Sequence, residues 1–366
     1  MRKTIIAASV SGLLLSTSAV AATIDDLKIS GFGTIAVGAS NQDFGYHGYD
    51  KDATFNDATL MGLQFDFQAN ERLSVTTQLV AKARYNYQAD VEMAYASYAA
   101  DGFTVRGGKL RAPIFNYSEY VDVGYSFPMV RPSNEVYGGL MVSTFTGMDL
   151  LVPFELGNTT LVLQPYAGET YVREEETPLG KVKLEEMMGV SLTWSVGDWL
   201  FRGSYTQADL APTVMTQDNS LYQLLVDSMD GAQTTFASLS AQYNNGVWFV
   251  NAEAMEHKVD GVFWDVAAAS LLIGRTFGSV MPYASVSYIE TTDDKERQAW
   301  GYPNNSYERT AYSLGARWDF LPKVALKGEV TWADFGDTYG GLDVNAFGSS
   351  LESDVLVYSL ALDFVF

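Results

Sequence analysis

The sequence predicts an all-β protein: a transmembrane antiparallel β-barrel of about 16 strands with a long third loop folded inward. Three observations predict it, namely a C-terminal strand with one apolar face, an export signal at the N-terminus, and strand-like segments separated alternately by tight turns and longer loops. In the final strand every second residue is apolar and large, as on a lipid-facing strand. These residues are Tyr358, Leu360, Leu362, Phe364 and Phe366.

The N-terminus has the pattern of a removable signal peptide. Arg2 and Lys3 precede an apolar run from Ile5 to Leu15, and Ala19-Val20-Ala21 supplies the small residues of a cleavage site. The run is shorter than the roughly 20 residues that a spanning helix needs. The predicted division is therefore a signal peptide at 1–21 and a barrel at 22–366. Because the chain has no cysteine, neither a disulfide framework nor a lipid anchor on cysteine is expected.

Composition supports a membrane barrel and argues against nucleic acid as a partner. The chain has 44 acidic and 23 basic residues, whereas nucleic-acid binding relies on basic surfaces. Its 22 Tyr, 20 Phe and 7 Trp are enough to form aromatic girdles at two membrane interfaces.

Strand and turn signals recur along the whole chain and predict sixteen strands. The tight turns fall at every second junction, so they belong to one end of the barrel, the periplasmic one. They are Asn70-Glu71-Arg72, Asp101-Gly102, Gly157-Asn158, Gly197-Asp198, Asn244-Asn245-Gly246, Gly278-Ser279 and Leu321-Pro322-Lys323. The predicted strands are 27–39, 58–69, 73–85, 91–100, 103–109, 140–156, 159–170, 186–195, 199–209, 233–243, 247–257, 264–277, 280–291, 310–320, 324–335 and 354–366.

Alternation along the strands assigns the two faces of the wall. Leu63, Phe65 and Phe67 alternate with polar residues, so the polar set is expected to face inward. A charge on the lipid face would cost about 2–4 kcal/mol at the midplane. Since sixteen strands enclose more space than their side chains fill, a wet, charged lumen is expected. The predicted inward charges include Arg106, Arg202, Glu253, Arg317, Asp319, Lys327 and Glu329.

The third loop, about 110–139, is unusually apolar and aromatic for a segment exposed to water. It is therefore expected to fold into the lumen. Phe115, Tyr117, Tyr120 and Tyr125 either pack against the wall or form a surface on which sugars stack, and packing is favoured.

Local motifs carry a resemblance to a known family. Gly108-Lys109-Leu110-Arg111-Ala112-Pro113, Asp122-Val123-Gly124-Tyr125 and Val130-Arg131-Pro132 resemble a less-studied branch of gammaproteobacterial porin-like proteins. The sixteen strands and long third loop are similar to the trimeric general porins of Gram-negative outer membranes. Two features depart from that pattern: the Pro-Glu-Phe-Gly-Gly type of third-loop motif is absent, and the second loop, Asn86–Asp90, is short.

The resemblance implies a location and a set of partners. The protein is expected in the cell outer membrane, in contact with its lipid and lipopolysaccharide, as a homotrimer. It also implies that the barrel-assembly machinery reads the terminal Phe366 as an assembly signal.

If the third loop folds inward as in porins, a charged constriction follows. Glu119, Asp122 and Glu135 would form an acidic rim that faces the basic wall residues Lys82, Arg84 and Arg106, and opposed charges of this kind set ion preference. The plainer alternative is that these are ordinary lumen or solvent charges. Two further candidates, Arg111 and Arg131, either contact solutes or, the favoured reading, pin the loop to the barrel.

Enzymatic and metal functions have little support in the sequence. The two histidines, His47 and His257, lie in no nucleophile motif, and only the pair of His257 and Glu253 merits a test. Acidic loop clusters at Glu174–Glu176 and Asp293–Asp294 either bridge lipopolysaccharide through divalent cations or, the favoured reading, are solvated. No cofactor is expected.

The sequence therefore predicts an outer-membrane porin, a water-filled channel for passive diffusion of small hydrophilic solutes and ions. Two alternatives stay open. One is a solute-specific channel with its binding site at the third loop, and the other is a non-conducting structural or adhesive barrel, which would need a plugged lumen.

Overall fold

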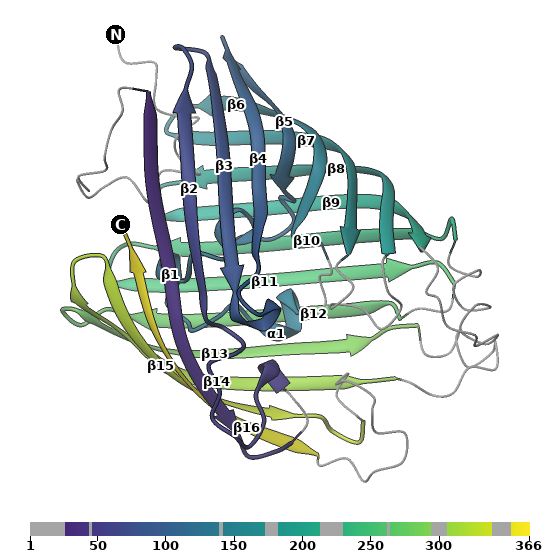
Figure 1. The fold of residues 1–366 in the computed structure, drawn as a ribbon. Coiled ribbons are helices and arrows are strands. Elements are labelled where there is room, and N and C mark those ends of the chain that lie inside the picture. The colour runs from purple at the N-terminus through teal and green to yellow at the C-terminus, as the bar shows by residue number, and fades with distance from the viewer. Residues whose placement is uncertain are drawn as a thin grey trace.

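Sixteen strands in the described part of the chain form one closed antiparallel barrel (Figure 1). The computed structural model describes residues 26–43, 46–138, 142–172, 182–212, 230–261, 264–293, 306–338 and 353–366. The predicted signal peptide and the Glu174–Glu176 cluster lie outside these residues. The strands are β1 (Leu27–Ser40), β2 (Leu60–Gln68), β3 (Leu73–Lys82), β4 (Ala89–Ala100), β5 (Phe103–Arg111), β6 (Thr144–Leu156), β7 (Thr159–Val172), β8 (Val182–Val196), β9 (Trp199–Pro212), β10 (Gln233–Asn244), β11 (Trp248–Val259), β12 (Val266–Arg275), β13 (Val280–Thr291), β14 (Glu308–Leu321), β15 (Val324–Asp334) and β16 (Asp354–Val365).

Each strand pairs with its neighbours in sequence, and β1 pairs with β16 to close the barrel. The predicted fold class and strand number are confirmed. In Figure 1 the front wall, β1 to β4, crosses the back wall at a steep angle, as tilted strands do in a closed barrel. The seven short turns lie at one end, here called the short-turn end, and the other end is called the long-loop end.

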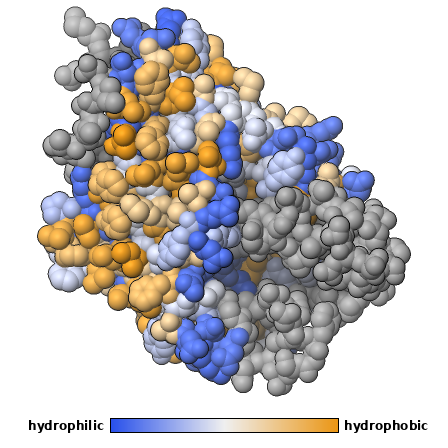
Figure 2. Space-filling model, viewed as in Figure 1, coloured by the Kyte–Doolittle hydropathy of each residue, from blue (hydrophilic) through white to orange (hydrophobic). Residues whose placement is uncertain are grey.

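The outer face of the barrel carries a band of apolar side chains. Leu239 and Leu314 are each 70% exposed, and aromatic side chains such as Trp199, Trp318 and Tyr358 are 42–52% exposed. Side chains so apolar and so exposed match the lipid-facing band of a membrane barrel. Figure 2 shows hydrophobic residues gathered over the body of the barrel.

The two faces exchange character toward the long-loop end. On β11, Val250 and Ala252 face out near the short-turn end, but the outward residues near the other end are Glu256 and Lys258, which pair at 2.9 Å. The inward residues change in the opposite sense, from Asn251 and Glu253 to Met255 and Val259. Strands β8 and β9 change in the same way: the outward residues become Lys183, Glu185, Gln207 and Asp209, and the inward ones become Val182, Leu184, Ala208 and Leu210.

An apolar core therefore fills the inside of the long-loop half. Its buried side chains come from β5 to β13, and include Leu110, Phe145, Leu184, Leu210, Phe236, Val266 and Ile289. Polar outside and apolar inside is the pattern of a barrel surrounded by water, so this half, here called the collar, differs in character from the apolar outer band. The expectation of a wet, charged lumen is corrected for this half, because the inward side chains of β5 to β13 form an apolar cluster there.

The closing strand packs its aromatic rings on glycines of β1. A Cβ atom at Gly31 would lie 2.2 Å from the Phe366 ring, and one at Gly33 would lie 2.5 Å from the Phe364 ring. The backbone of Phe366 exchanges hydrogen bonds with Gly31 at 2.9 and 3.0 Å. The terminal residue is thus part of the β1–β16 pairing, with its side chain 50% exposed on the outer face.

The helical elements are all short: η2 (Tyr46–Gly48), η3 (Ala83–Tyr85), η4 (Ser118–Tyr120), η5 (Gly124–Ser126) and α1 (Asn134–Tyr137). Among the described residues, no helix has the length and apolar character needed to cross a membrane.

The face assignment predicts opposite effects for arginine at two adjacent positions of β16. Leu360→Arg places a charge among lipid-facing side chains and is expected to destabilise the barrel by about 2–4 kcal/mol. Ser359→Arg points inward, opposite Glu329, and is expected to be tolerated. Urea unfolding in lipid vesicles measures both. Equal tolerance would mean that the register is wrong, since a one-residue slip exchanges the faces.

Candidate pore constriction

The residues between β5 and β6, here called the inner segment (residues 112–138), contact strands on opposite sides of the barrel. Its backbone or side chains hydrogen-bond residues of β3, β9, β11 and β15. A segment that contacts strands on opposite sides of the closed barrel lies in its lumen, where Figure 1 shows α1.

Small hydroxyl side chains on the wall make room for the first part of the inner segment. Ser204 and Ser238 both donate to the Ile114 carbonyl, at 2.8 and 2.5 Å, and Arg202 donates to the Phe115 carbonyl at 2.8 Å. A buried carbonyl needs such donors. The neighbouring Asn116 amide bonds Gln242 and Asn251 at 2.8 and 3.1 Å.

Four buried charges join the inner segment to β3, β4 and β5. Asp122 lies 2.8 Å from Lys82 and is also bonded by Arg111, while Glu92 lies 3.1 Å from Lys82 and 3.6 Å from Arg111. Each side chain is at most 9% exposed. Two cations and two anions alternate in this ring, so it is electrically balanced and closed to solvent.

The charges of this ring govern the protonation of Asp122. Burial alone would raise the pKa of its carboxyl, but Lys82 and Arg111 outweigh burial and hold that pKa well below the ordinary value. Asp122 is consequently ionised and bonded, and it forms part of an anchor rather than a rim exposed to passing ions.

A second anchor surrounds Glu135 at the start of α1. Its carboxylate accepts bonds from Arg309 at 2.6 Å, Ser287 at 2.7 Å and Tyr46 at 2.9 Å, and the residue is 1% exposed. Burial opposes ionisation here as well, yet Arg309 and the hydrogen bonds lower the pKa of Glu135 to about 2. This bond set ties the inner segment to β13, β14 and η2.

Arg131 forms a third anchor, toward the loop between β1 and β2. It pairs with Asp57, donates to the His47 carbonyl at 2.9 Å, and lies over the Tyr49 ring at 4.9 Å. Arg111, the last residue of β5, thus bonds Asp122 of the inner segment, and Arg131 of that segment bonds Asp57 in the loop between β1 and β2.

Arg106 and Glu119 form the loosest pair among the predicted constriction residues. Their closest atoms are 3.9 Å apart and their side chains remain 15% and 17% exposed. Arg106 itself is held by a bidentate bond to Asp149, at 2.9 and 2.5 Å, and lies over the Tyr95 ring. Glu119 is thus an acid of the inner segment that faces a fixed cation of the wall.

Arg84 is not brought to this region. Strand β3 ends at Lys82, and the chain turns through η3 into left-handed backbone at Asn86 (φ 53°). Arg84 is exposed and lies over the Tyr85 ring at 4.9 Å. Its predicted place on the inner wall assumed that the strand continued to Tyr85.

The aromatic residues of the inner segment pack against each other and the wall. Phe115 and Tyr117 are 2% and 1% exposed, and both rings lie within 6 Å of Tyr137. Tyr125 lies against Arg317, with the guanidinium 4.6 Å from its ring. This geometry agrees with packing rather than with a sugar-stacking surface.

The suspected pair of His257 and Glu253 makes no contact. Both lie on β11 facing inward, four residues apart, which separates them by about 13 Å along the strand. His257 stacks on Phe236 and bonds Thr234, whereas Glu253 accepts bonds from Tyr137 and Asn251. Within the described ranges no group of three or more His, Cys, Asp or Glu side chains is placed to hold a metal ion.

A polar cavity of about 30 Å³ separates the end of the inner segment from β11–β15. This is room for about two water molecules. Serines at 270, 285 and 287 line it together with Glu253 and Glu329. The cavity is thus large and polar enough to hold water beside the wall.

The partners Glu92, Asp149, Asp57 and Arg309 were not identified from the sequence. Asp149 and Arg309 do carry a signal, because alternation places both on the inner face of their strands. Glu92 carries none, since the register of β3 and β4 shifts at Gln78 and Leu79.

Comparison with known proteins gives the fold but no family assignment. No family model matches the chain, and no curated protein matches it. Solved structures match over nearly the whole length. OmpF of Salmonella typhi in complex with daunomycin is 14% identical, with a TM-score of 0.62 over 93% of this chain and 97% of that one. An anion-selective porin from Comamonas acidovorans is 14% identical, with a TM-score of 0.58 over 93% and 99%.

A third match is an outer-membrane protein of Vibrio cholerae, OmpT with loop L8 deleted, which is 12% identical, with a TM-score of 0.60 over 93% of this chain and 100% of that one. Identities this low show the fold alone. The chain has the sixteen-stranded closed barrel fold that outer-membrane porins have.

The buried charge ring predicts that Asp122 is structural. Asp122→Asn leaves Lys82 and Arg111 with a single anion, and breaking such a buried arrangement is expected to cost about 3–5 kcal/mol of folding free energy. Glu119→Gln, the matched control, removes a looser and partly exposed pair and is expected to cost about 1 kcal/mol or less. Urea unfolding measures the free energy of unfolding of the two variants. Similar losses of stability in both would contradict the structural role of Asp122.

The anchors are also expected to resist acid. The carboxyls of Asp122 and Glu135 both have depressed pKa values. Their contribution to stability is therefore complete above the pKa of about 4 that such groups have in the unfolded chain. It is lost only as pH falls through the folded values, about 2 for Glu135 and lower for Asp122. Hydrogen exchange of residues 112–138 should show unchanged protection from pH 7 to pH 4. Loss of protection near pH 5 would contradict the ion-pair anchors.

Proposed function

We propose that the protein is an outer-membrane porin of restricted bore, which lets small hydrophilic solutes and ions diffuse passively beside the inner segment. The observation that carries this proposal is the closed sixteen-stranded barrel with an apolar outer band and charged side chains on its inner wall. The porin fold of its structural neighbours supports the same class.

The passage is proposed to run beside Arg106 and Glu119. Lys82, Arg111, Asp122 and Glu135 are bonded in closed, buried groups, and Arg131 is tightly paired with Asp57. Arg106 and Glu119, by contrast, keep solvent contact and leave 3.9 Å between their nearest atoms. Gln64, Asp66 and Tyr95 face the same part of the lumen and are also partly exposed. An acid opposite a fixed guanidinium gives a short transverse field at a narrow point.

A non-conducting barrel is the second candidate, and the dry core favours it. The inward side chains of the long-loop half form one apolar cluster, and the inner segment bonds most of the wall. A solute-specific channel is the third candidate, but the arginines and aromatics proposed for its binding site are engaged in packing and anchoring.

Location and partners are proposed on the same basis. The short-turn end would face the periplasm and the polar collar would stand among lipopolysaccharide at the cell surface. Phe366 would present the assembly signal to the barrel-assembly machinery. A homotrimer is proposed because one structural neighbour, OmpT of Vibrio cholerae, is described in a trimer form. Neither catalysis nor a cofactor forms part of the proposal.

Planar-bilayer recording tests the proposal. The purified protein is expected to give small, well-defined conductance steps, in threes if it is trimeric, with a modest preference for cations. Glu119→Gln should shift the reversal potential toward anions because it removes the acid beside the passage. Glu256→Gln makes the same change on the outer face and should leave the potential unaltered.

Two results would overturn this account. Absence of conductance steps from folded protein would favour the non-conducting barrel. Conductance steps with an unchanged reversal potential in Glu119→Gln would show that Glu119 does not lie beside the passage.

A further inference from the structure

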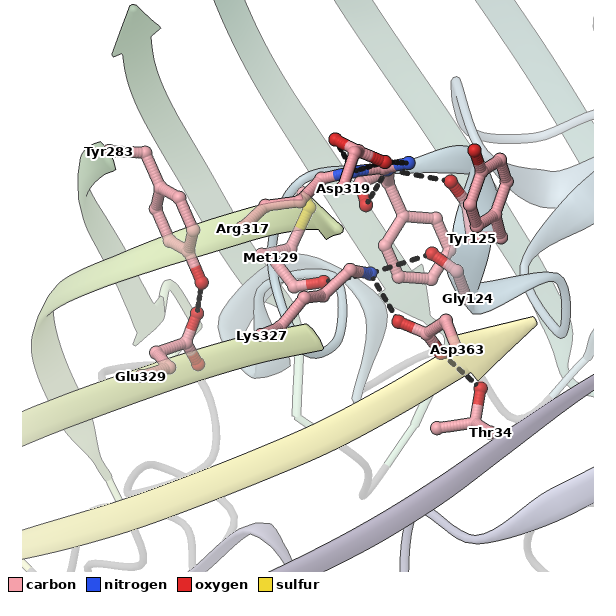
Figure 3. A network of polar contacts seen from close by, with 11 residues as sticks. Thr34, Gly124, Tyr125, Met129, Tyr283, Arg317, Asp319, Lys327, Glu329 and Asp363 are labelled. Carbon is pink, nitrogen blue, oxygen red and sulfur yellow. Dashed lines mark hydrogen bonds and ion pairs between the residues drawn. The ribbon is translucent and has the colours of Figure 1, made fainter. Parts of the chain in front are cut away.

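Where the first and last strands meet, the inner segment touches both of them. Lys327 of β15, Asp363 of β16 and Thr34 of β1 form one chain of contacts across this junction, here called the seam (Figure 3). The Lys327 ammonium lies 2.8 Å from the Asp363 carboxylate, and Thr34 donates to that carboxylate at 2.5 Å. Three strands, among them the first strand β1 and the last strand β16, thus share one buried polar group.

The inner segment completes the bonding of Lys327. The ammonium donates to the carbonyls of Gly124 and Met129, at 2.7 and 2.8 Å. The ammonium thus gives two hydrogen bonds to the inner segment and forms its ion pair with the closing strand. The side chains of Lys327 and Asp363 are both 0% exposed, so no water can replace a missing acceptor. Such a charge is tolerated only when it is paired and fully hydrogen-bonded.

Gly124 fits the seam with no spare room. A Cβ atom at this position would lie 2.2 Å from Asp363 Oδ1 and 2.6 Å from Thr34 Oγ1. Apolar contacts reinforce the fit, since Val123 packs with Phe32 of β1 and Val130 packs with Ala36 and Ala361 across the seam.

We propose that Lys327 couples closure of the barrel to insertion of the inner segment, so that the two form as a single cooperative unit. An unclosed barrel lacks the ion-pair partner Asp363 and its bond from Thr34, and an empty lumen lacks both carbonyl acceptors of Lys327. Either half alone leaves a buried ammonium under-bonded, so neither is stable without the other. The terminal strand is then fastened from inside by the same segment that narrows the lumen.

Arg317 offers a matched comparison from the neighbouring strand. It donates to the carbonyls of Tyr125 and Phe127, at 2.7 and 3.1 Å, so it also holds the inner segment. Its own ion pair, however, is with Asp319 on the same strand, 2.8 Å away, and does not involve the seam. Arg317 anchors the segment without linking it to closure.

Hydrogen exchange with mass spectrometry on folded protein in lipid vesicles tests the coupling. Lys327→Met is expected to speed exchange in residues 118–129 and in β16 together, by about tenfold or more, because it removes one member of a buried pair. Strands β11 and β12 should be unaffected. Arg317→Met is expected to speed exchange in residues 118–129 only. If Lys327→Met freed the segment while β16 kept its wild-type protection, the coupling would be refuted.

Two further measurements decide the matter if Lys327→Met does not fold. Gly124→Ala keeps every charge but forces the segment away from the seam, and should also release both regions together. In the unmodified protein, a urea series should show residues 118–129 and β16 losing protection at the same concentration. Loss of protection in the segment at clearly lower urea than in β16 would overturn the proposal.

Discussion

Closure of the barrel is the constraint on which the rest of this structure depends. Once β1 pairs with β16, the backbone groups of the wall are satisfied from strand to strand and no edge is left open. Sixteen strands, however, enclose more space than their own side chains can fill. That space has to hold either water or another part of the chain. Here an apolar core takes up the long-loop half, and the inner segment packs on into the short-turn half as far as Arg317 and Lys327. Polar, partly exposed side chains such as Arg106, Glu119 and Ser240 remain beside it.

Buried charge decides where the inner segment sits. Buried ion pairs are weak evidence for stability but they fix geometry, because any displacement leaves a charge unpaired in a dry environment. Asp122, Glu135 and Lys327 each have their partners on different strands, so the segment is positioned from several sides at once. Glu119 lacks such a set of partners. Of the three acidic candidates, Asp122 and Glu135 are therefore anchoring charges, and Glu119 alone faces the lumen.

The fold could be predicted from the sequence because its signals are local. Alternation with period two and tight turns at every second junction gave sixteen strands and the faces of residues such as Arg202 and Lys327. The collar was not predicted, since nothing in the alternation says where a strand leaves the lipid, and the same parity then carries apolar residues such as Leu210 inward. The partners of the candidate charged residues could not be predicted from the sequence either. Lys82 meets Glu92 only because of a register shift, and Glu135 meets an arginine 174 residues away.

The central claim is that an apolar core fills the lumen of the long-loop half, whereas the short-turn half keeps a hydrated passage beside the inner segment. Because the chain contains no cysteine, single cysteines on the inner wall report on this directly. Ser240→Cys lies inward in the short-turn half and is partly exposed, whereas Ala268→Cys lies inward in the apolar core at 5% exposure. The measurement is the rate of labelling of folded protein by a charged, water-soluble thiol reagent. The account predicts fast labelling at position 240 and strong protection at position 268. Equal, fast labelling at both would show a water-filled lumen along its whole length and contradict it.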